Sequence, residues 1–471
     1  MIKLYNTELN TVAIVENDEQ YTYGEFINYV CVMRDYFLGN NYRKITIILS
    51  NGLCAYVAMW ATYLSGGTFC MVNPEYPPAR IKCCISDFDS DIVLDSNNFD
   101  KNFLDALDVS FHDEQEEPAE YNEIAYVIMT SGSTGSPKGV CIYRDAFEDV
   151  IETATGLFGL SDRDIGGQYS NVSFDMGICD VFSFFSKGVT VVPVVGMDRI
   201  RPASVIGKYN ITFWYSVPTV LDLMERRGDI TYANLKSLRV MAFGGAILFE
   251  KHVRELFSVR EDMVIINTYG PTEITIFSSS ISLNSSNYEN YCDNGTVCIG
   301  NPIPEVKQKL HKNENGSEVV ITGRHVMAGY LSQIGDSSCN QAERNSKSFF
   351  TGDIVREKGG ALYFVSRNDT QVKLNGNRID ITEIEALIRS RDIGNAVVIE
   401  ADSKLVAFLS PEDIRNRLPE IKQYLKDNLP RYSLPNRYIF LGSLPKNVNG
   451  KYDRQRLKEI AKDTKSGVLG Q

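Results

Sequence analysis

Short apolar runs alternate with amphipathic stretches along most of the chain, and this alternation restricts the folds that it can adopt. The pattern predicts an α/β body of mostly parallel sheets covered by helices. In such sheets, functional loops lie at the carboxyl ends of the strands. We expect helices from the capping box Thr22–Glu25 to about Gly39 and at Leu53–Leu64, Pro202–Tyr209, Thr219–Arg226 and Glu250–Phe257, and strands at Ile45–Leu49, Phe69–Val72, Ile124–Met129, Val189–Val194, Ile211–Tyr215, Leu238–Phe243 and Val264–Asn267.

The pattern changes near Ser366–Thr370. Beyond it we expect a hairpin at Gln371–Asn377, a helix opened by a capping box from Thr382 to Glu385, strands at Ala396–Glu400 and Val406–Leu409, and a helix at Leu418–Asn428. This is the size of a small α+β domain. We therefore predict a large N-terminal body over 1–368 and a small C-terminal domain over 369–471.

The charge of the chain argues against nucleic-acid binding. The net charge is −12 at pH 7, whereas neutralising phosphates requires a basic face. The charge is uneven, because 371–471 carries five more basic than acidic residues. This excess is typical of a separate domain or of a docking face for an acidic partner, and an ordinary solvated surface explains it equally well.

The cysteines and histidines predict neither a metal centre nor a disulfide framework. The ten cysteines include no CxxC pair, and the four histidines are isolated. No signal-peptide pattern opens the chain, so we expect a protein of the reducing cytosol. The uncharged stretch Ile45–Pro74 is long enough to span a bilayer. Asn51-Gly52 and Ser65-Gly66-Gly67 divide it into strand, helix and strand, which favours a buried βαβ unit.

A loop rich in Gly, Ser and Thr, Thr130–Gly139, follows the apolar run that ends at Met129. Such a loop can surround phosphate oxygens with backbone N–H groups and a lysine ammonium. A Walker loop would need Ser or Thr directly after its lysine. Here Lys138 follows Pro137 and precedes Gly139, so the sequence predicts a phosphate loop of another type.

Four further segments carry groups suited to nucleotide chemistry. Asn267–Glu273 offers an aromatic ring, a hydroxyl and a carboxylate; Thr351-Gly352-Asp353 offers a carboxylate for ribose hydroxyls; Ser366–Asp369 offers a guanidinium; and Leu444–Lys451 offers a lysine before a helix. Each segment taken singly is equally typical of a turn, a cap or a surface ion pair.

In this order and together, the segments resemble the adenylate-forming superfamily of acyl-CoA synthetases, luciferases and amino-acid adenylation domains. Phe174-Asp175, Tyr269–Glu273 and Asn449-Gly450-Lys451 resemble the amino-acid-activating branch, in particular D-alanine–carrier-protein ligases and nonribosomal peptide synthetase adenylation domains. The resemblance covers the chain from Tyr21–Phe26 to Lys451. It implies an AMP-forming ligase that uses ATP and Mg²⁺.

The resemblance also implies roles for individual residues. Lys451, Glu273, Thr272 and Lys138 would be catalytic, and Glu273 would attend magnesium. At the phosphates, the ATP site would comprise Thr130, Ser131, Gly132, Ser133, Thr134, Gly135 and Lys138, with Thr272 near them. Around the adenine it would comprise Gly244, Gly245, Asn267 and Tyr269, and at the ribose Asp353 and Arg367. Gly270 would also belong to the ATP site, and Lys451 would lie between the substrate carboxylate and the α-phosphate.

In the family, the small C-terminal domain is a lid that rotates between two half-reactions. Asp369 would be its hinge, and the Gly376 segment would replace Lys451 at the site for thioester formation. The resemblance implies transfer to the phosphopantetheine thiol of a carrier protein. Since only 20 residues follow Lys451, we expect that carrier to be a separate chain. The basic excess of the lid suits an acidic carrier.

Asp175 is expected to pair with the α-ammonium of an amino acid, since a buried carboxylate needs a cationic partner. Position by position, the resemblance implies a side-chain site of Met176, Cys179, Tyr215, Met241, Phe243, Thr268, Gly270, Ile276 and Phe277. Three of these are bulky aromatics, which predicts a small side chain. D-Alanine ligases carry a cysteine where this chain has Phe243, which argues against D-alanine.

Two other functions fit the sequence. An acyl- or aryl-CoA ligase would use free CoA and would not need Asp175. A catalytically silent binding module would retain the fold alone, which the presence of Thr134, Glu273, Asp353 and Lys451 argues against.

Overall fold

A computed structural model describes residues 1–5, 8–107, 120–130, 137–314, 316–333, 346–367, 371–389, 395–446 and 452–464. Two compact units make up the chain. The first comprises 1–74, 85–129 and 139–368, and the second comprises 75–84, 130–138 and 369–471. The second unit thus includes the segments 75–84 and 130–138 in addition to the chain from residue 369.

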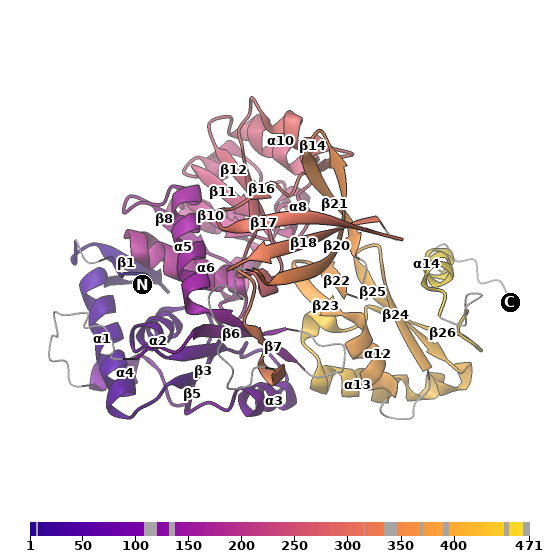
Figure 1. Ribbon diagram of the computed structural model, residues 1–471, viewed down its shortest axis with the longest axis horizontal. Helices are drawn as coiled ribbons and strands as arrows, with labels where there is room; N and C mark the ends of the chain where they lie inside the picture. The colour runs from indigo at the N-terminus through magenta and orange to yellow at the C-terminus, as the bar shows by residue number, and fades with distance from the viewer. Residues whose placement is uncertain are drawn as a thin grey trace. The chain divides into compact units, whose positions relative to one another are not determined.

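The first unit contains a nine-stranded sheet whose central strands are parallel. A strand buried on both faces reads as a continuous apolar run, which explains sequences such as Val240–Phe243. The order is β16 (Asn301–Pro302), β13 (Ser279–Leu283), β12 (Val264–Tyr269), β11 (Val240–Phe243), β10 (Phe213–Ser216), β8 (Ile165–Gln168), β9 (Thr190–Pro193), β1 (Val12–Glu16) and β2 (Glu19–Thr22) (Figure 1).

A second sheet has six strands in the order β19 (Gly329–Tyr330), β7 (Lys138–Tyr143), β6 (Ile124–Thr130), β4 (Thr68–Met71), β3 (Lys44–Ile48) and β5 (Ile92–Asp95). A third sheet is antiparallel: β17 (Val306–Asn313), β18 (Gly316–Gly323), β20 (Ser348–Lys358) and β21 (Ala361–Arg367). A short hairpin pairs β14 (Cys292–Asp293) with β15 (Thr296–Val297).

Helices surround these sheets, and two apolar clusters lie on the two faces of the nine-stranded sheet. One cluster contains Phe213, Tyr215 and Ala242, and the other contains Trp214 and Met241. The helices are α1 (Tyr23–Gly39), α2 (Leu53–Leu64), α3 (Pro78–Phe88), α4 (Lys101–Ala106), α5 (Arg144–Phe158), α6 (Asp175–Lys187), α7 (Pro202–Tyr209), α8 (Thr219–Arg227), α9 (Tyr232–Leu235) and α10 (Glu250–Val259), with 3₁₀ turns η1 (Gly196–Ile200), η2 (Thr272–Ile274), η3 (Tyr288–Tyr291) and η4 (Leu331–Gln333).

Local sequence signals set several of these elements. The capping box of α1 is confirmed: Glu25 N donates to Thr22 Oγ1 at 3.2 Å, and Thr22 N donates to Glu25 Oε2 at 2.7 Å. The stretch Ile45–Pro74 forms β3, α2 and β4, as predicted for a βαβ unit. In the part of the chain that the structure describes, we find no helix with the length and apolar character of a membrane span.

The second unit carries a hairpin of β22 (Gln371–Leu374) and β23 (Asn377–Asp380), followed by α12 (Ile381–Arg389). Its three-stranded sheet is β24 (Asn395–Ala401), β25 (Lys404–Ser410) and β26 (Arg437–Phe440). The helical elements η5 (Glu412–Arg417), α13 (Leu418–Asn428), η6 (Arg431–Ser433) and α14 (Arg454–Asp463) complete it.

The predicted capping box Thr382–Glu385 is wrong. Helix α12 begins at Ile381, so Thr382 lies inside its first turn. Asp380 caps the helix instead, because its Oδ1 accepts from Thr382 N at 3.0 Å and from Thr382 Oγ1 at 2.6 Å. The Glu385 carboxylate turns to β24 and accepts from Val398 N at 2.8 Å.

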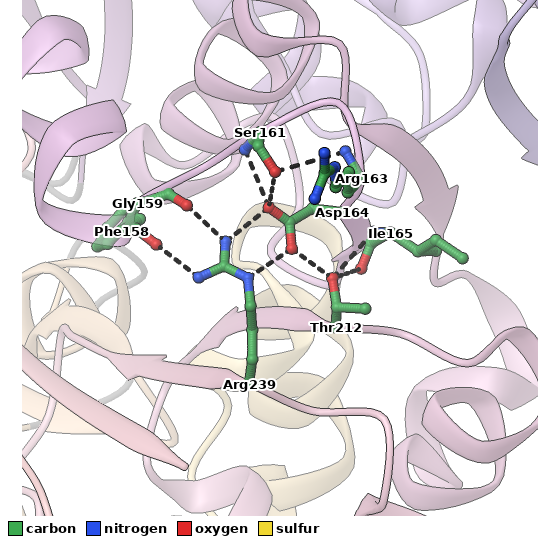
Figure 2. Close-up of polar contacts among 8 residues, drawn as sticks. All are labelled: Phe158, Gly159, Ser161, Arg163, Asp164, Ile165, Thr212 and Arg239. Atoms are coloured by element: carbon green, nitrogen blue, oxygen red, sulfur yellow. Dashed lines mark hydrogen bonds and ion pairs between the residues drawn. The ribbon is translucent and has the colours of Figure 1, made fainter. Parts of the chain in front are cut away.

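An ion pair between a buried aspartate and a partly exposed arginine joins the amino ends of three parallel strands (Figure 2). Asp164 precedes β8, Thr212 precedes β10 and Arg239 precedes β11. Arg239 donates from Nε and a terminal nitrogen to the two carboxylate oxygens of Asp164, each at 2.6 Å, and Thr212 Oγ1 donates to the same carboxylate at 2.7 Å. The network fixes the strands at the edge opposite their carboxyl ends.

Candidate functional site

The predicted adenine and side-chain residues meet at the carboxyl ends of β10, β11 and β12. The strand register aligns Ser216 with Phe243 and Phe243 with Asn267, so the loops that follow begin at the same edge. Parallel pairing of buried strands therefore brings these segments, distant in sequence, to one place.

A chain of hydroxyl groups connects β10 to β12. Thr268 Oγ1 donates to Phe243 O at 2.9 Å, so its own oxygen accepts from the Tyr215 hydroxyl 2.8 Å away. Burial raises the pKa of Tyr215 well above its ordinary value, which keeps this hydroxyl protonated. A Cβ on Gly244 would lie 2.6 Å from Thr268 Oγ1 and 3.0 Å from the Tyr215 hydroxyl oxygen, so glycine is required there.

The structure contradicts the assignment of Met241 and Phe243 to the same side-chain site as Tyr215. Both lie in the apolar cluster with Trp214, on the opposite face of the sheet from Tyr215. Side chains alternate between faces along a strand, so the neighbours Ala242 and Gly244 occupy the Tyr215 face instead. The residues of β11 that face Tyr215 are thus one position away from the predicted ones, and the argument from Phe243 against D-alanine is lost.

Helix α6 carries Asp175, Met176 and Cys179. Met176 and Cys179 are buried in the same apolar cluster as Tyr215, whereas Asp175 is only half-buried at the amino end of the helix. The expectation of a buried carboxylate at Asp175 is therefore wrong. Its Oδ1 accepts from Met176 N at 2.9 Å, and the helix amino terminus favours its negative charge.

The buried carboxylate of α6 is Asp180, which the sequence did not single out. Asp180 is 1% exposed, and neither of its carboxylate oxygens has a hydrogen-bond partner among the described residues. Burial raises the pKa of Asp180 well above its ordinary value. An acid among apolar positions of an amphipathic helix is the one signal that could have identified it.

Asp353 and Arg367, both predicted at the ribose, lie opposite each other on β20 and β21. Arg367 donates to Asp353 Oδ1 at 2.5 Å, and the Tyr269 hydroxyl donates to Oδ2 at 2.7 Å. Asp353 is fully buried. Burial, and then the charge of Asp353, raise the pKa of Tyr269 well above its ordinary value, so Tyr269 remains a donor. Each carboxylate oxygen retains capacity for a further hydrogen bond.

Glu273, the predicted magnesium residue, is buried in η2 directly after β12. The Tyr330 hydroxyl donates to its Oε1 at 3.1 Å, and Met327 N donates to its backbone carbonyl at 2.8 Å. Thr272 begins the same turn. Sequence reasoning missed Tyr330, because nothing in its local pattern indicates a contact with residue 273.

The turn after Glu273 has an unusual backbone. Thr275 and Ile276 adopt φ values of 57° and 72°, which β-branched residues rarely do. Gly270 lies so close to this turn that a Cβ would be 2.6 Å from Phe277 Cα. The packing thus holds Ile276 and Phe277 close to the end of β12.

Asn267 has a donor that is satisfied and an acceptor that is not. Its Nδ2 donates to Cys298 O at 2.8 Å, while its buried Oδ1 has no partner among the described residues. An unsatisfied buried acceptor suits a ligand that carries an N–H donor, such as an adenine amino group. Gly245, with φ of 76°, follows β11 nearby in the chain.

The remaining predicted residues are distributed as follows. Thr130 and Lys138 belong to the second unit, where Thr130 Oγ1 donates to Lys138 O at 3.1 Å. Ser131, Gly132, Ser133, Thr134, Gly135, Asp369 and Lys451 lie outside the described residues.

Comparison with known proteins identifies the family. Residues 5–331 match the AMP-binding enzyme family, and residues 383–451 match the AMP-binding enzyme C-terminal domain. The chain belongs to the AMP-binding enzyme family. It is an AMP-forming ligase with the large α/β body and small C-terminal domain of the adenylate-forming fold, as the sequence predicted, and its nucleotide is ATP.

Relatives of this AMP-binding enzyme include a D-alanine–D-alanyl carrier protein ligase of Staphylococcus haemolyticus, 26% identical, with 95% of this chain and 96% of the relative aligned. Zwittermicin A synthase ZmaJ of Bacillus cereus is 27% identical over 89% of this chain and 86% of its own. The adenylation domain AlmE of Vibrio cholerae, solved with glycyl-adenosine-5'-phosphate, superposes with a TM-score of 0.79 at 25% identity, covering 97% of this chain and 95% of the domain.

Proposed function

We propose that this enzyme activates a small α-amino acid with ATP and transfers it to the phosphopantetheine thiol of a separate carrier protein. The observation that carries the proposal is Asp175 at the amino end of α6, on the helix that also supplies Met176 and Cys179 to the Tyr215 side of the sheet. A carboxylate in this position would attract the α-ammonium of an amino acid. The names of the carrier protein ligase and of the glycyl-adenylate complex agree with this substrate class.

In the first half-reaction, a carboxylate oxygen of the amino acid would attack the α-phosphorus of ATP. The bond from that phosphorus to the bridging oxygen breaks, pyrophosphate leaves with the electron pair, and aminoacyl-AMP remains. Because two anions must meet, the barrier depends on cationic groups at the equatorial oxygens. We assign Lys451 and Lys138 to this role.

In the second half-reaction, the carrier thiol would lose its proton to solvent and its sulfur would attack the acyl carbon. The bond from that carbon to the phosphate oxygen breaks, which releases AMP and leaves a thioester. Asp369 would be the hinge by which the C-terminal domain, 369–471, changes position between the two steps. The basic excess of that domain agrees with docking of an acidic carrier.

The residues present fit ATP and magnesium. The unsatisfied Asn267 Oδ1 would accept from the adenine amino group, and Asp353 would accept from the ribose hydroxyls. Glu273 supplies the hard oxygen that Mg²⁺ prefers, and Thr272 lies beside it. Bound magnesium would neutralise phosphate charge while Glu273 holds it in place.

The proposed side-chain site is bounded by Tyr215, Thr268, Ala242 and Gly244, with Ile276 and Phe277 beyond the end of β12. Tyr215 and Phe277 are bulky and buried, so we expect the site to accept only a small substrate side chain. Because Gly244 and not Phe243 faces this site, alanine of either hand would fit. A methylene adds only about 1–3 kcal/mol of discrimination, so we expect measurable activity with neighbouring small amino acids.

Hydroxylamine trapping tests the proposal without any knowledge of the carrier. The enzyme is incubated with ATP, Mg²⁺, hydroxylamine and one acid at a time, and the hydroxamate is measured. The acids are each common amino acid in both enantiomers and a set of fatty and aryl acids. We expect hydroxamate with glycine, alanine or serine and none with fatty or aryl acids. Hydroxamate only with fatty or aryl acids, together with thioester formation on free CoA, would replace the proposal with an acyl-CoA ligase.

Asp175→Asn tests the ammonium contact. Losing a charged hydrogen bond should raise the KM for the amino acid about ten- to hundred-fold and leave the KM for ATP unchanged. Asp198→Asn, at an exposed position of η1, is the matched control and should change neither value. An unchanged amino-acid KM in Asp175→Asn would contradict this assignment.

A further inference from the structure

Helices α8 and α10 cover the face of the nine-stranded sheet that carries Trp214. Val220, Leu221 and Met224 of α8 share an apolar cluster with Val253 and Leu256 of α10. The two helices therefore hold a fixed spacing on the sheet. None of the residues discussed below belongs to the proposed ATP or amino-acid site, so this inference does not depend on the proposed function.

Two carboxylates and an imidazole meet between these helices. Asp222 and Glu225 lie one turn apart on α8, which directs them to the same side of the helix. His252 comes from the first turn of α10. Its Nε2 lies 3.3 Å from Asp222 Oδ1 and 3.3 Å from Glu225 Oε2, and all three atoms lie within 4.8 Å of one another.

The two nitrogen–oxygen separations are close to the edge of a metal coordination tetrahedron. Bonds of about 2.0–2.1 Å from zinc to nitrogen and oxygen place neighbouring ligand atoms about 3.4 Å apart. Both nitrogen–oxygen distances, 3.3 Å each, are close to that edge. A cation could enter between the three atoms with little movement of the helices.

The burial of His252 holds its ring in place against the two carboxylates. Its side chain is 0% exposed, and its Nδ1 has no hydrogen-bond partner among the described residues. A neutral imidazole carries a single proton, so a proton on Nε2 has to be shared between two carboxylate oxygens. If the proton is on Nδ1 instead, the lone pair of Nε2 faces the two carboxylate oxygens, which is unfavourable. A cation at the shared point would satisfy Nε2 and both carboxylates at once.

Lys251 competes for the same oxygen. Its ammonium nitrogen lies 2.7 Å from Glu225 Oε2 and 3.8 Å from Asp222 Oδ1. The Lys251 side chain is 55% exposed, so it can turn toward water when the carboxylates bind a cation. A metal and this ammonium would therefore exclude each other from Glu225.

We propose that Asp222, Glu225 and His252 form a binding site for a divalent transition-metal cation of the zinc type, which fastens α8 to α10. One nitrogen and two oxygens suit Zn²⁺ better than Mg²⁺ or Ca²⁺, which bind oxygen ligands alone. Water would complete the tetrahedron. Lys251 sets the affinity by competing with the metal.

Calorimetric titration of the full-length enzyme, stripped of metal by a chelator, tests the site with ZnCl₂ as the probe. We expect one saturable Zn²⁺ per chain, and a melting temperature that rises with Zn²⁺ and falls again after chelation. Glu225→Gln and His252→Asn should each weaken binding at least about ten-fold. Glu225 is 43% exposed, so its variant should fold even if the histidine variant does not.

Lys251→Gln separates a metal site from a simple ion-pair cluster. It removes the competing cation, so Zn²⁺ should bind several-fold more tightly than in the wild type. His311→Asn, at an exposed position of β17, is the matched control and should leave the affinity unchanged. Absence of saturable Zn²⁺ binding in the wild type, or weaker binding in Lys251→Gln, would overturn the proposal. An equal loss in His311→Asn would show non-specific surface binding and would overturn it as well.

Discussion

At the scale of single residues, α6 contains two acids whose surroundings differ. Asp175 is half-buried at the amino end of the helix, where the backbone favours its charge. Asp180 is 1% exposed and has no hydrogen-bond partner among the described residues. We assign the first to substrate binding, while the second imposes a cost on folding at neutral pH.

Asp180→Asn should therefore stabilise the protein in a pH-dependent manner. Burial raises the folded-state pKa of Asp180, so folding takes up a proton there. The cost is absent below the unfolded pKa of about 3.9 and grows as the pH rises toward the folded pKa. Urea unfolding should show that the variant gains at least about 1 kcal/mol more at pH 8 than at pH 4. A gain that does not change with pH would contradict this account.

At the scale of elements, the strands of the nine-stranded sheet are fixed at one edge and carry the proposed site at the other. The Asp164–Arg239 pair, with Thr212, fixes β8, β10 and β11 at their amino ends (Figure 2). Burial alone would raise the pKa of Asp164, but the hydrogen bonds and charge of Arg239 outweigh it and lower the pKa below its ordinary value.

Asp164→Asn should destabilise the protein by about 2–3 kcal/mol at pH 7, because Arg239 loses its anionic partner. For a carboxylate with a lowered pKa, the stabilisation is complete above the unfolded pKa of about 3.9 and is lost as the pH falls through the folded pKa. Denaturant titrations of the wild type and the variant should converge as the pH falls below about 3.9. A constant difference down to pH 2 would show that the charge of Asp164 is not responsible.

The sequence predicted β9, β10, β11 and β12 of the nine-stranded sheet with ends within about two residues. It did not predict β8, the helices α5 and α6, or the antiparallel sheet of β17, β18, β20 and β21. It did not predict which face each side chain of β11 occupies. Val240–Phe243 is apolar on both faces and buried on both, so no alternation marks the inward residues and a shift by one position is invisible. The hydrogen bond from Tyr269 to Asp353 could not be predicted from the sequence either, because it depends on how two sheets pack and not on any local pattern.

At the scale of the whole molecule, the proposed function requires the C-terminal domain to serve two half-reactions in turn. The residues that we assign to this change, Asp369 and Lys451, lie outside the described residues, and their roles come from the proposed function alone. The two residues nevertheless lead to different predictions, since Asp369 would act as a hinge and Lys451 would act at the reacting atoms.

Asp369→Pro should uncouple the two half-reactions. Proline fixes φ and removes an N–H, so a hinge at this position should lose its second conformation. We expect hydroxamate formation within about three-fold of the wild type and a loss of carrier loading of at least about ten-fold. Intact-protein mass spectrometry of a phosphopantetheinylated carrier measures the loading. An equal loss of both activities would contradict the hinge assignment.

Amino-acid-dependent exchange of labelled pyrophosphate into ATP tests the central claim most directly, when it is measured for the wild type and for Lys451→Ala. The wild type should exchange only when its amino acid is present. Removing one cation from the transition state should lower that exchange about 100- to 1000-fold, with the melting temperature unchanged. Exchange that proceeds without any amino acid, or that persists at the wild-type rate in Lys451→Ala, would contradict the account.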